Sequence, residues 1–221
     1  MDIFNIAIDG PSGSGKTTIA KALSERLGIA YLDTGAMYRS VAYYIAGLNI
    51  SASDEQGVKS VLDNIELKVE YSQGVNRLFV NGEEVTDKIR TPEISMSAST
   101  VSKIKEVRLK LVALQREIAR KVSCVLDGRD IGSFVLPEAD YKFYLTADVD
   151  ERAKRRFLEL KAKGENVTID GVKEAMIARD AQDEKRAFAP LVVPQGAFVV
   201  DTTNLTIEEV IDILLSKIKI R

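Results

Sequence analysis

Two kinds of pattern of apolar and polar residues, one typical of buried strands and one of helices, alternate along the chain. Residues 3–8 are apolar at nearly every position, which is typical of a parallel strand buried on both faces. A glycine-rich turn follows, and Ile19, Leu23 and Leu27 then recur at helical spacing up to Gly28, a common stop signal. A strand, a glycine loop and a helix in this order predict the first half of a βαβ unit.

The same rhythm returns later in the chain. An apolar segment at 29–32 precedes a helical pattern that runs to Ile45, with Thr34 as the expected helix cap. Further strands are predicted at 122–126, 141–145 and 198–200, and further helices at 93–102, 104–121, 150–163, 171–186 and 207–218.

The middle of the chain has a different rhythm. Residues 66–85 alternate apolar and polar side chains around Gly74 and an Asn81-Gly82 turn, which indicates an antiparallel hairpin. Polar, turn-rich stretches flank this region. We therefore predict an antiparallel insert, about residues 60–95, within a parallel α/β core.

Composition narrows the class of protein. The 221 residues are 45% hydrophobic and carry 31 basic against 33 acidic side chains, which argues against a dedicated nucleic-acid binder. A single cysteine, Cys124, and the lack of histidine exclude an intrachain disulfide, a Cys/His zinc site and a His-based triad. No basic leader and no apolar run of about 18 residues are present, so we expect a soluble, cytosolic protein.

The glycine-rich turn matches the phosphate-loop pattern G-x-x-x-x-G-K-[ST] and sits at the required strand-to-helix junction. Its glycines let backbone N–H groups converge on phosphate oxygens, Lys16 can reach the β- and γ-phosphates of ATP, and Thr17 can ligate Mg²⁺. The alternative is a glycine-rich turn with a helix cap. The expected ATP-binding residues are Gly10, Pro11, Ser12, Gly13, Ser14, Gly15, Lys16, Thr17 and Thr18.

A second acidic loop, Asp127-Gly-Arg-Asp130, follows the apolar strand predicted at 122–126. The carboxyl end of a strand is the ligand side of an open α/β sheet, so Asp127 is placed to hold Mg²⁺ directly or through water, and Arg129 to reach a phosphate. The alternative is a surface turn with an ion pair, because Asp-Gly is common in turns.

Arginines recur near the ends of the predicted elements. Planar guanidinium groups bind phosphate bidentately, and phosphoryl transfer depends mostly on positioning and electrostatics. The spacing of Arg179, Asp183 and Arg186 predicts one helix face, and taken alone such a set is more typical of an exposed ion-pair face than of a phosphate site. Likewise, the basic helix with Arg152, Arg155 and Arg156 is either a solvated surface or a lid over ATP. The array comprises Arg39, Arg108, Arg129, Arg179 and Arg186.

Missing motifs are informative too. The sequence has no Asn-Lys-x-Asp guanine-reading motif and no His-Arg-Asp kinase loop. The lack of histidine is no handicap when the acceptor is a phosphate, which already carries its nucleophilic oxygen. A phosphate acceptor is therefore favoured.

Five segments in order, I-D-G-P-S-G-S-G-K-T, Y-L-D-T-G-A-M-Y-R, I-R-T-P-E-I, V-L-D-G-R-D-I-G and R-D-A-Q-D-E-K-R-A-F-A-P-L, resemble the bacterial cytidylate kinases. The resemblance covers essentially the whole chain. It implies ATP- and Mg²⁺-dependent phosphorylation of CMP or dCMP to the diphosphate. It also implies an α/β nucleoside monophosphate kinase fold, with a five-stranded parallel sheet flanked by helices, a three-stranded antiparallel insert and a short lid.

As a single domain, such a chain would have a core at about 1–59, 96–149 and 165–221, the insert at 60–95 and the lid at 150–164. The resemblance also assigns residue roles. The catalytic residues would be Lys16, Asp127, Arg129, Arg152 and Arg156. The resemblance does not fix which of the two lid arginines, Arg152 or Arg156, reaches the transferring phosphate. The acceptor phosphate would be held by Ser12, Arg39, Arg129 and Arg186, and the acceptor site would also be lined by Thr34. The ribose would be surrounded by Tyr38, Arg179 and Asp183. The cytosine base would be recognised by Ser99, Arg108 and Asp130.

Other functions stay open on sequence grounds. A kinase for UMP, dTMP or a non-nucleotide acid would share most of these features. A non-enzymatic switch module could use the phosphate loop to bind ATP while the insert contacts a partner. For the kinase, we expect a monomer acting on small nucleotides, with no nucleic-acid polymer or membrane as a partner.

Overall fold

The computed structural model describes residues 3–72 and 75–219 and divides the chain into two compact units. The terminal unit comprises residues 1–28 and 125–221, and the middle unit comprises residues 29–124. Each unit is described by itself below. The division into core, insert and lid that the sequence suggests stays a prediction.

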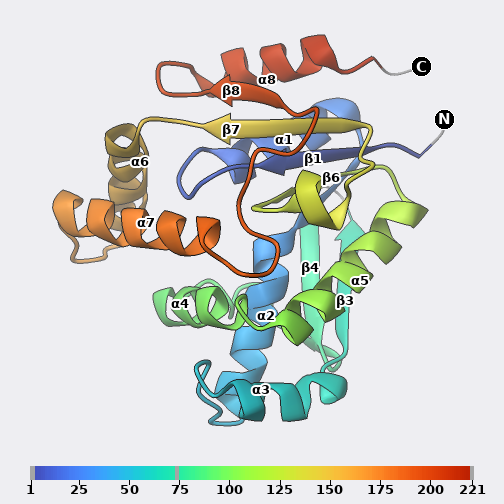
Figure 1. Ribbon diagram of the computed structural model, residues 1–221, viewed down its shortest axis with the longest axis vertical. Coiled ribbons are helices and arrows are strands. Elements are labelled where there is room, and N and C mark those ends of the chain that lie inside the picture. Colours follow the sequence, from blue (N-terminus) through green and yellow to red (C-terminus); the bar gives the residue numbers. More distant parts are fainter. Residues whose placement is uncertain (1–2, 73–74, 220–221) are drawn as a thin grey trace. The chain divides into compact units, whose positions relative to one another are not determined.

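The terminal unit alternates strands and helices (Figure 1). Its elements are β1 (Asn5–Asp9), α1 (Lys16–Leu27), β6 (Cys124–Gly128), a π-helical turn η2 (Ile131–Val135), β7 (Tyr141–Thr146), α6 (Val149–Ala162), α7 (Ile169–Glu184), β8 (Phe198–Asp201) and α8 (Ile207–Lys217). Helix α1 packs against α8, and α6 packs against α7.

A five-stranded sheet with the order β2-β6-β1-β7-β8 confirms the predicted parallel α/β core. Strand β1 pairs in parallel with β7, Ile8 opposite Phe143, and β7 pairs in parallel with β8. Ile6, Ile8 and Phe143 are almost fully buried, as expected for a central strand covered on both faces. Because the strands are parallel, β1 and β6 deliver the phosphate loop and Asp127 to the same edge of the sheet.

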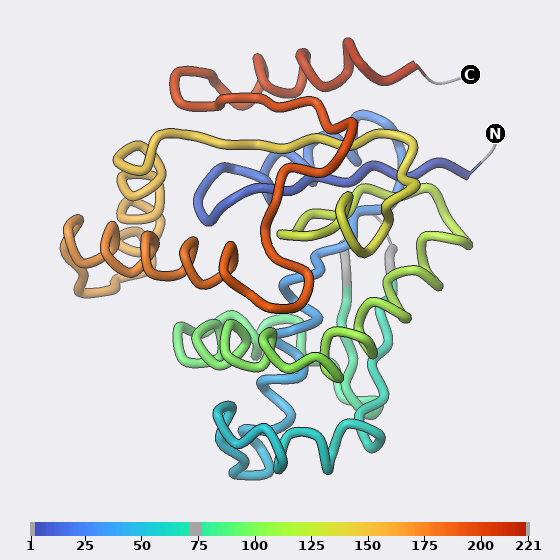
Figure 2. Tube along the Cα trace, viewed as in Figure 1, coloured from blue at the N-terminus to red at the C-terminus, as the bar shows by residue number. Residues whose placement is uncertain are grey.

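The middle unit combines helices with a small antiparallel sheet. Its elements are β2 (Ala30–Asp33), α2 (Thr34–Gly47), α3 (Glu55–Val61), a 3-10 turn η1 (Leu62–Asn64), β3 (Leu67–Ser72), β4 (Val75–Val80), β5 (Glu83–Glu84), α4 (Pro92–Val101) and α5 (Lys105–Lys121). Helix α2 packs against α4, and the two cross at a steep angle in Figure 2.

The antiparallel sheet has the order β3-β4-β5 and confirms the predicted three-stranded insert. Its register places Leu67 opposite Val80. The Asn81-Gly82 turn forms as expected, with both residues at positive φ, 50° and 84°, the conformation that this dipeptide adopts readily. The turn predicted around Gly74 falls outside the described residues.

Two local predictions are wrong. Thr34 is the first residue of α2, and the cap is Asp33, whose Oδ1 accepts the Ala36 N–H at 2.8 Å. Helix α7 ends at Glu184, so Arg186 lies beyond the helix and does not share a helix face with Arg179. Helix α3 was not expected from the polar stretch that precedes it.

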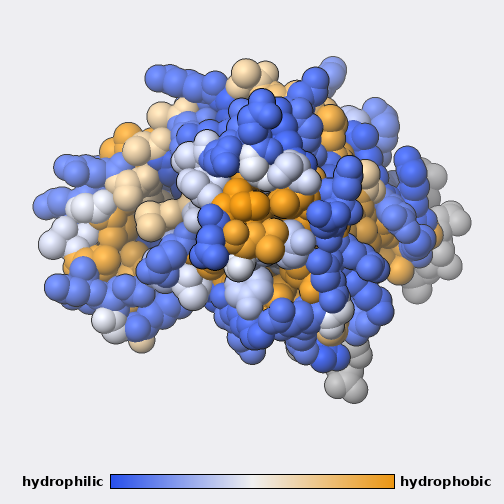
Figure 3. Space-filling view, turned by 90° about the horizontal axis from the view of Figure 1, so that it is seen from below, coloured by the Kyte–Doolittle hydropathy of each residue, from blue (hydrophilic) through white to orange (hydrophobic). Residues whose placement is uncertain are grey.

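Hydrophilic side chains predominate on the face shown in Figure 3, with hydrophobic side chains gathered in a patch near its centre. Several large apolar side chains are exposed at separate places, including Met96 on α4 and Leu158 on α6. Among the described helices, none combines the length and apolarity needed to cross a membrane.

Candidate active site

The phosphate loop has glycine at two positions where φ is positive and little space is left for a side chain. Gly10 has φ 146°, and a Cβ there would lie 2.0 Å from the Leu145 carbonyl oxygen. Gly13 has φ 74°, and its Cβ would lie 2.6 Å from Met176 Cε. The loop is therefore packed tightly between β7 and α7.

Lys16 is the first residue of α1 and is only 5% exposed. Its ammonium group donates to the Pro11 carbonyl at 2.5 Å and to Ser14 Oγ at 3.3 Å. Burial lowers the pKa of Lys16 well below its usual value, and the positive charges of Arg129 and Arg179 lower it further. An incoming anion at this place would offset that unfavourable charge.

Thr17 and Asp127 meet although they are far apart in the sequence. Thr17 Oγ1 donates to Asp127 Oδ2 at 2.8 Å, and Asp127 is buried at the end of β6. A hydroxyl and a carboxylate are hard oxygen ligands, and Mg²⁺ at nucleotide sites typically takes one or two protein oxygens beside those of the phosphates. The pair therefore fits the predicted Mg²⁺ site, although the described residues contain no cluster of three or more metal-binding side chains.

Asp9 anchors the second acidic loop to the end of β1. Its two carboxylate oxygens accept the N–H groups of Ile131 and Gly132, each at 2.7 Å. Burial raises the pKa of Asp9 to about 7, against the lowering effect of those two hydrogen bonds. Asp9 thus fixes where the loop that carries Arg129 and Asp130 begins its turn into η2.

Charged side chains of the second acidic loop and of α7 form an ion-pair cluster. Arg129 Nε donates to Asp183 Oδ2 at 2.9 Å, and Arg186 Nη1 lies 3.9 Å from Asp183 Oδ1. Arg179, one helical turn before Asp183, is exposed. The terminal unit thus gathers Arg129, Asp183 and Arg186, of which the resemblance assigns the two arginines to the acceptor phosphate and Asp183 to the ribose.

The two candidate lid arginines have different surroundings on α6. Arg152 is buried, donates to the Ser12 carbonyl at 2.9 Å and pairs with Asp180 of α7. Arg156 pairs with Glu159 of its own helix at 2.8 Å. Which of them reaches a transferring phosphate stays a prediction.

The remaining predicted residues lie in the middle unit. Arg108 of α5 is 1% exposed, lies 5.6 Å from the centre of the Tyr38 ring and donates to the Ser102 carbonyl at 3.2 Å. Arg39 donates to Asp33 Oδ2 at 3.0 Å. Thr34, Tyr38 and Arg39 all come from α2, and Ser99 comes from α4.

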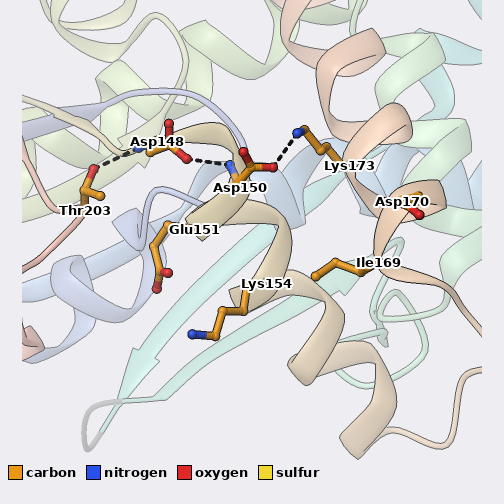
Figure 4. Close-up of a pocket in the computed structure, with 8 residues that line it drawn as sticks. All are labelled: Asp148, Asp150, Glu151, Lys154, Ile169, Asp170, Lys173 and Thr203. Atoms are coloured by element: carbon orange, nitrogen blue, oxygen red, sulfur yellow. Dashed lines mark hydrogen bonds and ion pairs between the residues drawn. The ribbon is translucent and has the colours of Figure 1, made fainter.

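The predicted site residues therefore fall into two groups, one in each unit. A cavity of about 410 Å³ in the terminal unit lies elsewhere, between the beginnings of α6 and α7 (Figure 4). None of the predicted site residues lines it. Its lining residues are Asp148, Asp150, Glu151, Lys154, Ile169, Asp170, Lys173 and Thr203.

Sequence reasoning missed two acidic residues that organise the terminal group. Asp9 could have been noticed as a charged residue ending an otherwise apolar strand. Asp180 stands inside the segment R-D-A-Q-D-E-K-R, but its spacing gives no sign that it faces the phosphate loop rather than solvent.

Comparisons with known proteins show the family to which the sequence is similar. The family model described as cytidylate kinase matches residues 6–220. The cytidylate kinase of Caldicellulosiruptor saccharolyticus is 48% identical over 97% of this chain and 95% of its own length. That of Halalkalibacterium halodurans is 44% identical over the full length of both chains. An uncharacterized protein from Eubacterium ventriosum shares the fold, with a TM-score of 0.57, 14% identity and 99% of each chain covered.

We predict that Asp9 makes the protein less stable as pH rises from about 4 to about 7. In this range the folded state keeps the Asp9 proton while the unfolded state, with an ordinary aspartate pKa of 3.8, has released it. The folded state binds more protons, so the free energy of unfolding falls with increasing pH, by about 2 to 4 kcal/mol from this group.

Denaturant unfolding of wild type and Asp9→Asn at several pH values isolates the contribution of Asp9, because the asparagine cannot titrate. The stability of wild type relative to the variant should decrease between pH 4 and 7. A constant difference over this range would show that Asp9 titrates normally.

Proposed function

Because this chain belongs to the cytidylate kinase family, we propose that it catalyses the ATP-dependent phosphorylation of CMP and dCMP to CDP and dCDP. The observation that carries the proposal is the similarity to curated cytidylate kinases over nearly the whole chain, at close to half of all positions. The buried lysine in a phosphate loop supports the phosphoryl-transfer chemistry.

In this reaction an oxygen of the CMP phosphate attacks the γ-phosphorus of ATP. The bond from that phosphorus to the bridging oxygen breaks, and ADP leaves with the bond's electron pair. The attacking phosphate is already largely dianionic near neutral pH, so the protein need not supply a histidine base. Its work is to align the two phosphates and to stabilise the charge between them.

The candidate residues of the terminal unit would bind ATP and stabilise its reacting phosphates. The phosphate loop's N–H groups and Lys16 would hold the β- and γ-phosphates, and Arg129 beside them would offset charge on the transferring group. Thr17 and Asp127 would hold Mg²⁺, which supplies Lewis-acid polarisation of the phosphate oxygens.

The resemblance to cytidylate kinases supports acceptor-binding roles for a further set of residues. We propose that the acceptor phosphate is held by Ser12, Arg39, Arg129 and Arg186. The acceptor site would also be lined by Thr34, and the ribose would be surrounded by Tyr38, Arg179 and Asp183. Arg108, Ser99 and Asp130 would read the base. The position of Arg108 over the Tyr38 ring, a cation–π contact, would help to hold the guanidinium in place for that task. The monomeric state and cytosolic location expected from the sequence stay predictions.

A panel of nucleoside monophosphates in an assay of ADP formation tests the proposal. ADP should form rapidly only when CMP or dCMP is added. Rapid turnover with UMP or dTMP instead would indicate another acceptor, and slow ATP hydrolysis that no acceptor stimulates would indicate a switch module.

Lys16→Ala should reduce kcat at least several hundredfold, because a buried electrostatic stabiliser of the transition state is worth roughly 3 to 4 kcal/mol. The melting temperature should change little. Lys21→Ala, which removes an exposed lysine from the same helix, is the matched control and should keep its activity. Turnover of Lys16→Ala within about tenfold of wild type would exclude this role.

Asp130→Asn and Asp130→Ala should lose CMP activity and narrow the preference for CMP over UMP. An ionised Asp130 can accept from the cytosine amine, whereas uracil would present a carbonyl oxygen to it, at a cost of roughly 1 to 3 kcal/mol per unpaired group. Asp130 is 5% exposed, which suits base reading better than a surface turn.

The measurement is kcat/KM for CMP and UMP, where wild type should prefer CMP by at least about tenfold to a hundredfold. An alanine variant that keeps both its CMP turnover and its discrimination would remove Asp130 from base reading.

A further inference from the structure

Helices α6 and α7 form a hairpin with a small hydrophobic core of its own. Ala153 of α6 and Val172 and Met176 of α7 are buried together. Three partly buried side chains, Phe157, Leu160 and Val167, pack against them. The hairpin is thus held together largely by contacts between its own two helices, and of its three core residues Met176 also lies against the phosphate loop.

The hairpin contacts the phosphate loop at Ser12 and Gly13. Asp180 of α7 accepts the Ser12 N–H at 3.0 Å, and Arg152 of α6 donates to the Ser12 carbonyl at 2.9 Å. A Cβ on Gly13 would lie 3.2 Å from Arg152 Cβ, and closer still to Met176 Cε. One peptide segment of the loop is therefore held from both sides by the two helices of the hairpin.

Asp180 is the central group of this contact. One of its carboxylate oxygens accepts the Ser12 N–H while the other pairs with the Arg152 guanidinium. Arg152 also donates to the Ala147 carbonyl at 3.0 Å, which fixes its orientation. Both charged side chains are about nine-tenths buried, and a buried pair of this kind loses much when either charge is removed.

A second ion pair between the same two helices provides a comparison. Asp150 of α6 pairs with Lys173 of α7 at the exposed cavity shown in Figure 4, and the Asp150 side chain is 69% exposed. This pair links the helices without touching the phosphate loop. A variant that removes this pair therefore changes a contact between the two helices without changing a contact with the phosphate loop.

We propose that Asp180 is a positioning residue for phosphoryl transfer, which acts by fixing Arg152 and the Ser12 peptide in one arrangement. The inference rests on the proposed kinase function. Asp180 touches neither nucleotide in this scheme. It sets the place of a loop peptide beside the phosphates and of a guanidinium that can stabilise their charge.

A double-mutant cycle tests the proposal with kcat for CMP phosphorylation. Asp180→Asn keeps an oxygen for the Ser12 N–H but loses the charge that pairs with Arg152. It should lower kcat by about tenfold or more, and Asp180→Ala should lower it further. In an Arg152→Ala background, Asp180→Ala should slow the enzyme by less than about threefold, because the two residues act as one unit. Asp150→Asn should keep wild-type kcat.

Independent losses in the double mutant, or Asp180 variants that melt earlier but turn over normally, would overturn the proposal. Hydrogen exchange of residues 10–18 gives a second readout that does not depend on activity. Exchange there should be faster in both Asp180 variants and unchanged in Asp150→Asn. Unchanged exchange in the Asp180 variants would also overturn it, whereas a wild-type protein inactive on CMP would contradict only the kinase function.

Discussion

The burial of a positive charge at the start of α1 is the constraint on which the site depends. Lys16 is nearly inaccessible, donates to two neutral oxygens of its own loop and lies in the positive field of Arg129 and Arg179. Burial and like charge both make this ammonium group less stable than it would be in water. In the proposed function a polyphosphate would add negative charge at this place, so the unfavourable burial of the ammonium group would favour nucleotide binding.

Acidic side chains hold this positive site in place, and two of them, Asp127 and Asp9, only partly offset the effect of burial on the Lys16 charge. Asp9 is committed to two backbone N–H groups, Asp183 to Arg129, and Asp180 to Arg152 and Ser12. Each carboxylate thereby fixes a different part of the terminal unit: the second acidic loop, the arginine that follows it, and the α6–α7 hairpin. These contacts hold the candidate phosphate-binding residues of the terminal unit in fixed positions, as preorganised electrostatic stabilisation would need.

Local sequence patterns predicted much of this structure because they act over short distances. The apolar run, glycine loop and helix of residues 3–28, and the Asn81-Gly82 turn, each formed as expected. The cap of α2 was misassigned because Asp33 and Thr34 are adjacent and both can cap, and only the extended backbone at Asp33 decides. The end of α7 was misplaced because its buried apolar residues, Val172 and Met176, lie far from it.

Long-range partners could not be predicted in the same way. The resemblance named Arg152, but nothing in the spacing pairs it with Asp180, 28 positions away. Asp9 and Gly132 are 123 positions apart and meet only because the sheet places the ends of β1 and β6 side by side. Such contacts depend on the topology, whereas the motifs reveal only which residue types the chemistry needs.

The titration of Lys16 tests the central claim most directly. Nuclear magnetic resonance of protein with isotope-labelled lysine side chains can follow its ammonium group, with Lys16→Arg used to assign the signal. The account predicts a pKa below the ordinary 10.5 in the free protein and a higher one in complex with a bisubstrate analogue, two nucleosides joined by a polyphosphate. An ordinary pKa in the free protein, or one that the analogue leaves unchanged, would contradict it.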